Sequence, residues 1–431
     1  MPAPVRFPRL ADWLEWQQSA HPSAIELGLE RVARVLARTG WRRPAGPVIT
    51  VGGTNGKGSC VALLEAMLRA GGYRVGTFTS PHLVDYRERI RLDDRWISEA
   101  SLVAAFERIA DARGPDSLTF FEFNALAALL AFETWSPDVI VLEVGMGGRL
   151  DAVNVVDADV AVVVSVGLDH MEWLGPDVES IGREKAGIFR PGRPAVCADP
   201  RPPQRLLEVA RQLGADLWLL GRDFGYQGDR QQWAYAGRRL RRAGLPYPSL
   251  RGANQLLNAA GSLAALEALG QRLPVSQQAV RHGLLNVELA GRFQVLPGRP
   301  AVILDVAHNP HSAAVLAANL DNMGFYPRTL AVLGMLRDKD AGGVVDKLAG
   351  RIDHWYVGGT TGPRGLSGTA LAETVRGRHP AATVDAYDDV TAAFDAAHRA
   401  AAADDRIVTF GSFLTVAEVM RALRRRVAEP R

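Results

Sequence analysis

Two kinds of hydrophobic pattern alternate along the chain and predict a layered α/β fold. Short apolar or β-branched runs are typical of strands that are buried on both faces of a parallel sheet. In the first half these runs cover residues 47–51, 73–78, 138–144 and 159–166. Between them apolar residues recur at spacings of three and four, as at Val61, Leu64 and Leu68, which predicts a helix. This alternation favours a doubly wound sheet with helices on both faces.

The pattern changes at two places further along. Between Pro191 and Pro248, glycine- and aromatic-rich segments follow a helical stretch and predict β-hairpins. Around Asn286–Phe293 the helical pattern breaks, and a second βα series begins at Ala301. Other expected helices cover residues 10–18, 29–38, 99–112, 121–135, 204–213, 254–269, 276–285 and 414–426. Other expected strands cover residues 301–306, 328–333, 354–357, 383–386 and 406–410.

We therefore expect an α/β protein with two domains. Residues 1–288 should form an N-terminal domain with a mainly parallel sheet and a small β region. Residues 289–431 should form a smaller, Rossmann-like α/β domain. The first strand of that second domain is not followed by G-x-G-x-x-G, so a bound dinucleotide is not implied.

Composition and charge describe an ordinary globular protein. The 431 residues are 47% hydrophobic and 23% charged. The formal charge of +3 gives no reason to expect nucleic acid, and the arginine clusters at 238–242 and 424–426 lack interleaved aromatics. We expect no membrane span and no secretion signal. Two cysteines, Cys60 and Cys197, form neither a disulfide framework nor a metal motif. We therefore expect a cytoplasmic protein, and nothing demands more than a monomer.

The stretch VGGTNGKGS, residues 51–59, joins the first strand to the first helix of the sheet. Its glycines can turn backbone N–H groups toward one anion, and the helix N-terminus adds partial positive charge. Lys57 could reach the terminal phosphates, and Ser59 could place its hydroxyl on a magnesium ion. Gly58 separates these two residues, so the stretch departs from the usual G-x-x-x-x-G-K-[ST] spacing. The order of strand, loop, lysine, hydroxyl and helix still predicts a P-loop-type ATPase domain rather than a ligand-free turn.

Polar residues follow the next two buried strands of the same sheet. Glu143 ends one strand, at the edge where NTPases place the acid that orders magnesium. The alternative is a carboxylate that pairs with a nearby arginine. His170 follows the next strand, and for it a metal ligand and a structural histidine are both open. Lys185 lies beside acids on a predicted helix, where a surface ion pair is the usual outcome.

The second domain also has polar residues at a strand end. Asp305 and His308 follow its first strand, and Asn309-Pro310 has the chemistry of a helix start. A capping role is therefore a serious alternative to a ligand role. Arg292 stands at the expected domain boundary, where an arginine could reach phosphate.

These motifs together resemble the folylpolyglutamate synthase/dihydrofolate synthase family, which is related to the Mur ligases. The resemblance runs through nearly the whole chain and is strongest to the bifunctional bacterial members. It departs at Val306, where glycine is frequent, and at Asn124, where threonine is frequent. The motifs that carry it are GTNGKGS at 53–59, TSPHL at 79–83, EVG and GGRLD at 143–151, LDH at 168–170 with LG at 174–175, EKAG at 184–187, GRF at 291–293 and DVAHNP at 305–310.

The resemblance implies ATP-dependent amide ligation. ATP would phosphorylate a carboxylate on dihydropteroate or on a reduced folate, and the amine of L-glutamate would attack the acyl phosphate. Positioning and charge neutralisation carry phosphoryl transfer, which suits a phosphate loop with magnesium. An acyl phosphate must be shielded from water, which suits a cleft that closes between two domains. The first domain would then bind ATP and the second would be a glutamate-ligase domain.

The resemblance also assigns roles to residues. The magnesium ligands would be Ser80, Glu143 and His170, with two ions expected. The ATP-binding residues would be Gly56, Lys57, Gly58, Ser59, Asn258, Arg292 and Asp305. Lys185 would be carbamylated and assist the second magnesium, and His308 would lie near the transferred phosphate; with Lys57 these are the expected catalytic residues. The dihydropteroate site would contain Glu26, Leu27, Gly28, Thr119, Phe120, Phe121, Leu150, Asp151 and Ala152.

Two other functions are weighed against this one. A Mur-type ligase acting on a nucleotide-linked peptide usually has a separate N-terminal nucleotide-sugar domain, and only about forty residues precede Pro47 here. A regulatory NTPase would hydrolyse ATP without any dependence on an amino acid. It would have no need of Lys185 or Asp305.

Overall fold

The structure is a computed structural model that describes residues 5–229, 231–252 and 254–428, with side chains up to Arg425. Its described residues divide into two compact units. The first contains the chain up to Pro81, Arg87–Ser249 and Leu256–Val287. The second contains His82–Tyr86, Leu250–Gln255 and the chain from Glu288 onward. Among the described residues, no helix is both long enough and apolar enough to cross a membrane.

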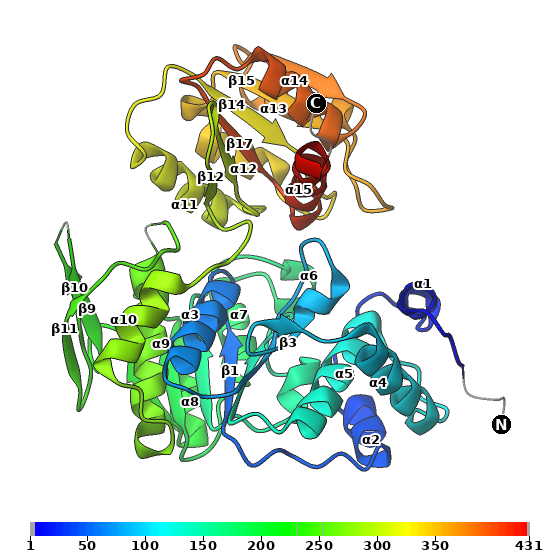
Figure 1. The fold of residues 1–431 in the computed structure, drawn as a ribbon, viewed down its shortest axis with the longest axis vertical. Helices are drawn as coiled ribbons and strands as arrows, with labels where there is room; N and C mark the ends of the chain where they lie inside the picture. Colours follow the sequence, from blue (N-terminus) through cyan, green and yellow to red (C-terminus); the bar gives the residue numbers. More distant parts are fainter. Residues whose placement is uncertain (1–4, 230, 253, 429–431) are drawn as a thin grey trace. The chain divides into compact units, whose positions relative to one another are not determined.

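The first unit is built on the sheet that contains β1 and β3 (Figure 1). In the described chain its strand order is β4-β3-β2-β5-β1-β6-β7-β8. Neighbouring strands in the series β2-β5-β1-β6-β7-β8 pair in parallel. The remaining strands, β3 and β4, form an antiparallel edge beside β2. The expected mainly parallel sheet is therefore confirmed. The strands are β1 (Val48–Gly52), β2 (Val75–Phe78), β3 (Ile90–Leu92), β4 (Arg95–Trp96), β5 (Val139–Glu143), β6 (Val160–Val163), β7 (Pro194–Cys197) and β8 (Asp216–Leu219).

Helices flank this sheet, and most begin where the sequence predicts. A capping box starts one of them: the Thr119 side chain accepts from the N–H of Glu122, and the Glu122 side chain accepts from the N–H of Thr119. The helices are α1 (Leu10–Ser19), α2 (Glu30–Arg38), α3 (Lys57–Ala70), α4 (Glu99–Ala112), α5 (Phe120–Trp135), α6 (Met171–Leu174), α7 (Val178–Ala186), α8 (Gln204–Leu213), α9 (Gln255–Leu269) and α10 (Gln277–Asn286).

The expected small β region is a three-stranded antiparallel sheet, β11-β10-β9. Its strands are β9 (Gly225–Gly228), β10 (Trp233–Ala236) and β11 (Arg241–Leu245). In the arginine cluster beside it, Arg238, Arg239 and Arg241 are exposed. Arg238 is ion-paired with Asp216 and Asp223 and lies 4.4 Å from the centroid of the Trp218 ring. In the second arginine cluster, the side chain of Arg426 lies outside the described residues.

The second unit contains a sheet with the order β12-β13-β17-β14-β15-β16 in the described chain. The strands pair in parallel except for β12. One face carries α11, α12 and α13, and the other carries α14 and α15. The strands are β12 (Gln294–Leu296), β13 (Ala301–Leu304), β14 (Thr329–Leu333), β15 (His354–Gly358), β16 (Val384–Tyr387) and β17 (Arg406–Phe410). The helices are α11 (Pro310–Asp321), α12 (Ala341–Leu348), α13 (Gly368–Arg378), α14 (Val390–Ala400) and α15 (Phe413–Ala428).

A short connector, residues 82–86, belongs to the second unit although both of its flanking segments belong to the first. Leu83 is buried in a core cluster of the second unit with residues of β13, α14 and α15. Arg421 donates a hydrogen bond from Nη2 to the Val84 carbonyl oxygen at 3.2 Å. The chain that leaves Ser80 is therefore anchored in the second unit within a few residues.

Candidate active site

The glycine loop between β1 and α3 is fixed by the segment that follows β6. The N–H of Thr54 donates to the Ser165 carbonyl oxygen at 2.8 Å, and the N–H of Asn55 donates to Ser165 Oγ at 3.1 Å. Lys57 Nζ donates to the carbonyl oxygens of Gly53 (3.0 Å) and Thr54 (3.3 Å). The ammonium thus lies over the loop whose N–H groups are expected to face phosphate.

Gly56 occupies a position that a side chain cannot share. Its φ is 88°, in the left-handed region, and a Cβ there would lie 2.7 Å from Asn258 Oδ1 and 2.9 Å from Val164 Cγ1. Asn258, on α9, is buried and therefore lies directly against the loop. The structure thus brings Asn258 and the loop together although they lie far apart in the sequence.

Two of the three expected metal ligands meet at the carboxyl edge of the sheet. Glu143 is buried at the end of β5, and its Cα is paired with that of Val51 on β1. The N–H of Ser80 donates to Glu143 Oε2 at 3.1 Å. The serine hydroxyl and the carboxylate offer oxygen ligands, which magnesium prefers.

The third expected ligand, His170, is held by its neighbour. His170 has a φ of 52°, its N–H donates to Asp169 Oδ1 at 3.0 Å, and its Nε2 lies 3.9 Å from the same oxygen. Within the described part of the chain, no three His, Cys, Asp or Glu side chains form a metal-binding group. The Ser80 hydroxyl and the Glu143 carboxylate therefore supply oxygen donors that fit a magnesium ion.

Lys185 departs most from the expectation drawn from its neighbours in sequence. It is 3% exposed, so it is not a surface ion pair. Glu184, the adjacent acid, instead pairs with Arg149. Burial lowers the pKa of Lys185 to about 7, and the charge of Lys57 lowers it further, against the opposing charges of Asp169 and Asp151. A substantial fraction of the amine is therefore unprotonated near neutral pH.

The loop after β5 brings Lys185 to this edge of the sheet. A Cβ at Gly148 would lie 2.9 Å from the Glu184 carbonyl oxygen and 3.0 Å from that of Lys185. The N–H of Arg149 donates to the Glu184 carbonyl oxygen at 2.8 Å. Glycine at position 148 is thus what lets the end of α7 pack against the loop that begins at Glu143.

Asp151, which closes this loop, is buried and serves first as a backbone anchor. It accepts from the N–H of Met146 (2.8 Å) and of Val153 (3.1 Å), and it caps the 3₁₀ turn η2 (Ala152–Val155). Burial raises its pKa to about 7, against the backbone hydrogen bonds. At neutral pH this carboxyl is poised between its two protonation states.

The three segments expected to bind dihydropteroate lie together in the first unit. Both α2 and α5 pack against η2, and Arg31 on α2 hydrogen-bonds to both Glu26 and Glu122. The Phe121 ring lies 5.9 Å from that of Phe78 and covers Gly145, where a Cβ would lie 2.4 Å from Phe121 Cζ. The guanidinium of Arg89 lies 5.6 Å from the centroid of Phe120. The aromatic pair therefore adjoins the loop that follows Glu143.

In the second unit, three expected residues gather at the carboxyl end of β13. Asp305 accepts from the N–H of Phe293 and of Ala307, both at 2.8 Å. Burial raises its pKa, opposed by the Ala307 hydrogen bond and by the charge of Arg292. His308 Nδ1 lies 2.8 Å from the Val306 carbonyl oxygen.

The capping role weighed for Asn309 is also present. Asn309 Oδ1 accepts from the N–H of Ser312 at 2.8 Å, and Pro310 begins α11. The cap of α11 and the expected ligand role do not compete, because the cap uses Asn309 and the ligand role would use Asp305 and His308.

Some residues at these sites carry no signal in the sequence. Phe413, at the start of α15, lies 4.8 Å from the Arg292 guanidinium and 6.3 Å from the His308 ring. Ser165 fixes the phosphate loop. Both come from positions that only the folded sheet brings near. Cys60 is buried beside Ser262, and burial raises its pKa to about 12, so its thiol stays protonated near neutral pH.

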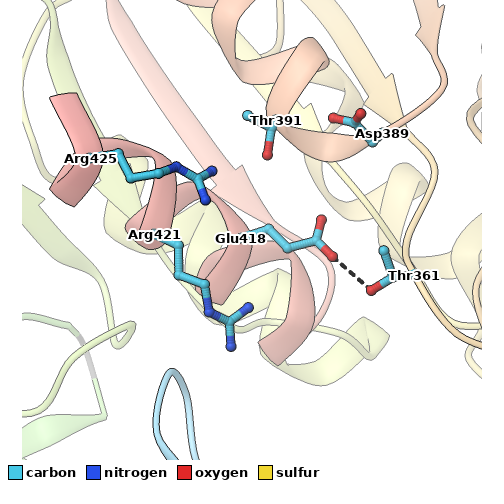
Figure 2. Close-up of a pocket in the computed structure, with 6 residues that line it drawn as sticks. All are labelled: Thr361, Asp389, Thr391, Glu418, Arg421 and Arg425. Atoms are coloured by element: carbon cyan, nitrogen blue, oxygen red, sulfur yellow. Dashed lines mark hydrogen bonds between the residues drawn. The ribbon is translucent and has the colours of Figure 1, made fainter.

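A pocket of about 480 Å³ in the second unit contains none of the expected residues (Figure 2). It is lined by Thr361, Asp389, Thr391, Glu418, Arg421 and Arg425. Thr361 Oγ1 donates to Glu418 Oε1 at 2.9 Å, and Asp389 caps α14. Arg421 holds the connector through Val84. These contacts hold neighbouring segments of the second unit together.

Comparison with known proteins gives a consistent result across the chain. The Mur ligase middle domain matches residues 51–199, and the Mur ligase glutamate ligase domain matches residues 291–413. The dihydrofolate synthase/folylpolyglutamate synthase of Escherichia coli is 45% identical over 414 residues, 96% of this chain and 95% of that one. The Haemophilus influenzae protein of the same name is 38% identical over 427 residues, 95% of this chain and 96% of that one.

Solved structures agree with the sequence matches. The E. coli FolC structure in complex with DHPP and ADP has a TM-score of 0.94 at 45% identity, covering 99% of this chain and 100% of that one. A bifunctional folylpolyglutamate synthase/dihydrofolate synthase with Mn, AMPPNP and L-glutamate bound has a TM-score of 0.90 at 43% identity, covering 98% and 100%. The α/β fold expected from the sequence is therefore confirmed.

Proposed function

Because this chain belongs to the dihydrofolate synthase/folylpolyglutamate synthase family of Mur ligases, we propose that it joins L-glutamate to dihydropteroate and to reduced folates. The enzyme is an ATP-dependent carboxylate–amine ligase. A carboxylate oxygen of the pterin substrate attacks the γ-phosphorus of ATP, and ADP leaves. The glutamate amine then attacks the acyl carbon, losing a proton, and inorganic phosphate leaves.

The chain's own residues account for the first step. Lys57 would leave the carbonyl oxygens of Gly53 and Thr54 for the negatively charged phosphates. The N–H groups at the start of α3 would bind the same phosphates. Asn258 would hold the loop from α9, and the second unit would supply Arg292, Asp305 and His308. In this account, positioning and charge neutralisation supply most of the catalysis.

ATP and a divalent metal ion accompany this chemistry, as in the relative with Mn and AMPPNP. We propose that the ion is magnesium and that Ser80, Glu143 and His170 hold it. The bound ion would neutralise phosphate charge. The chemistry of Ser80 and Glu143 supports this assignment, because each offers an oxygen donor and the backbone N–H of Ser80 donates to Glu143 Oε2, which holds the two residues together.

We further propose that Lys185 is carbamylated. Only an unprotonated amine can add CO₂, and burial gives Lys185 such an amine near neutral pH. The resulting carbamate would convert a buried cation into an anion able to assist a second magnesium ion. It would also remove the repulsion between Lys185 and Lys57.

The observation that carries the proposal is the meeting of three features at one sheet edge. The phosphate loop, the Ser80–Glu143 pair and the buried Lys185 all lie there in the first unit. A regulatory NTPase needs the loop and an acid, but it has no use for a buried lysine whose pKa is lowered to about 7 beside them. We propose a monomer that acts on small molecules in the cytoplasm, without nucleic acid or membrane partners.

A coupled ADP-release assay tests the proposal. We expect ADP release with dihydropteroate or tetrahydrofolate only when L-glutamate is also present, because the acyl phosphate needs the amine to turn over. The matched controls omit the pterin or the glutamate in turn. Equal ATP turnover without glutamate would contradict ligation, and activity with only one acceptor would limit the protein to one of the two reactions.

A further inference from the structure

Arg31, in the first turn of α2, joins two of the segments that form the proposed dihydropteroate site. Its Nε donates to both oxygens of Glu122, at 2.9 and 3.0 Å. Its Nη2 donates to the Glu26 carbonyl oxygen at 2.8 Å, and its Nη1 donates to the Glu26 carboxylate. One guanidinium therefore binds the turn at residue 26 and the start of α5 together.

The hydrogen bonds between Arg31 and Glu122 are buried, and Glu122 also binds Thr119. The Glu122 side chain is 4% exposed, and that of Arg31 is 13% exposed. Glu122 Oε2 also accepts from the N–H of Thr119 at 2.8 Å and from Thr119 Oγ1 at 3.0 Å. The carboxylate that Arg31 binds thus fixes the residue directly before Phe120 and Phe121. A displacement of Arg31 would therefore also displace Phe120 and Phe121.

The Glu26 carboxylate is bound by two side chains, those of Arg31 and His21. His21 Nε2 lies 2.7 Å from Glu26 Oε2, while His21 Nδ1 lies 2.8 Å from Ser117 Oγ. The hydrogen bond with His21 and then that with Arg31 lower the pKa of Glu26, so the carboxylate stays ionised at neutral pH. Ser117 lies just before α5, so this second path joins the same two segments. The turn that carries Leu27 and Gly28 is therefore set against the α5 start.

We propose that Arg31 is a positioning residue that sets the spacing between residues 26–28 and 119–121, and with it the fit of the pterin substrate. This inference rests on the proposed function. Arg31 acts through Glu26 and Glu122, while the substrate would contact the segments that these two acids hold. A guanidinium suits the task because its planar fork can bind two acceptors in fixed directions, which a lysine ammonium cannot do.

The chain offers a matched control on the same helix. Arg34 and Arg38 both pair with Asp116, at 2.6 and 2.7 Å, and so also tie α2 to the chain before α5. These two pairs are more exposed and end three residues short of Thr119. Arg34→Met and Arg38→Met remove similar ion pairs without touching the proposed substrate segments.

The test measures KM for dihydropteroate, KM for ATP and kcat in the coupled ADP assay. For Arg31→Met we expect KM for dihydropteroate to rise about tenfold, since a charge-assisted hydrogen-bond pair is lost. KM for ATP and kcat at saturation should change less than about twofold, because the phosphate loop is not part of this network. Arg31→Lys should recover only part of the loss. The Arg34 and Arg38 variants should match the wild type.

Other results of this test would overturn either the inference about Arg31 or the proposed function. An unchanged KM for dihydropteroate in Arg31→Met would overturn the inference, as would an equal rise in the Arg34 control. A matching rise in KM for ATP would overturn it too, because that would indicate general loosening. If Arg31→Met does not fold, Glu122→Gln provides the same test while keeping an acceptor for Thr119. A wild-type enzyme without dihydropteroate-dependent ADP release would refute the proposed function instead.

Discussion

Replacing Lys57 with methionine is expected to lower kcat for ADP release by about 10²–10³-fold, the scale set by removing one preorganised charge from a transition state. The ammonium lies over the phosphate loop, bound to the carbonyl oxygens of Gly53 and Thr54. Methionine keeps the length of the side chain and removes its charge. The thermal unfolding temperature should change little, because the lost hydrogen bonds are partly exposed. The measurement is kcat with both dihydropteroate and tetrahydrofolate.

The control for this variant is unusually simple. The sequence contains only four lysines, Lys57, Lys185, Lys339 and Lys347, and arginine supplies the remaining basic side chains. Lys347 is exposed on α12 in the second unit. Lys347→Met should therefore retain wild-type kinetics. If Lys57→Met kept kcat within about threefold of the wild type, the loop would not stabilise the transferred phosphate in the way proposed.

The second large effect is expected at Lys185. Lys185→Ala should lower kcat by about 10²–10³-fold, and a small carboxylic acid such as acetate should restore part of the activity. The reason is that the added carboxylate can take the place left by the carbamate. Acetate should not raise the activity of Lys57→Met, which has lost a cation instead. Full activity of Lys185→Ala without acetate would remove Lys185 from the mechanism.

The lowered pKa of Lys185 also gives this account a pH dependence. The amine is protonated below a pKa of about 7 and neutral above it. Since only the neutral amine adds CO₂, activation of CO₂-depleted enzyme by bicarbonate should weaken as the pH falls below 7. With so few lysines in the chain, the carbon signal of a ¹³C-labelled carbamate can be assigned by comparison with Lys185→Ala.

Much of the fold follows from local pattern, and the exceptions have physical reasons. The expected ranges for α4, α8 and β17 agree with the structure residue for residue. The two helices have a clear period, and β17 is a continuous buried run. The hairpin of β3 and β4 was not predicted. These strands have only three and two residues, too few to show an alternation. The short edge strand β12 escaped prediction for the same reason.

Some residues of the candidate site can likewise be predicted from the sequence, and others cannot. The loop at 51–59 and Glu143 stand at strand ends that the sequence reveals, so their meeting is predictable from sheet topology. Lys185 is different, because its neighbours in sequence predict a surface ion pair. Its burial depends on Gly148 and on the use of Glu184 by Arg149. Arg31 is different again, since its role exists only once α2 and α5 are packed.

The most direct test of the central claim follows the oxygen atoms of the acceptor carboxylate. Dihydropteroate labelled with ¹⁸O in its carboxylate is incubated with ATP, L-glutamate and enzyme, and the inorganic phosphate is analysed by mass spectrometry. We expect one ¹⁸O atom in each phosphate released, because the carboxylate oxygen that attacks the γ-phosphorus leaves with it. Unlabelled phosphate formed from labelled dihydropteroate would contradict the acyl-phosphate route and with it the account of this site.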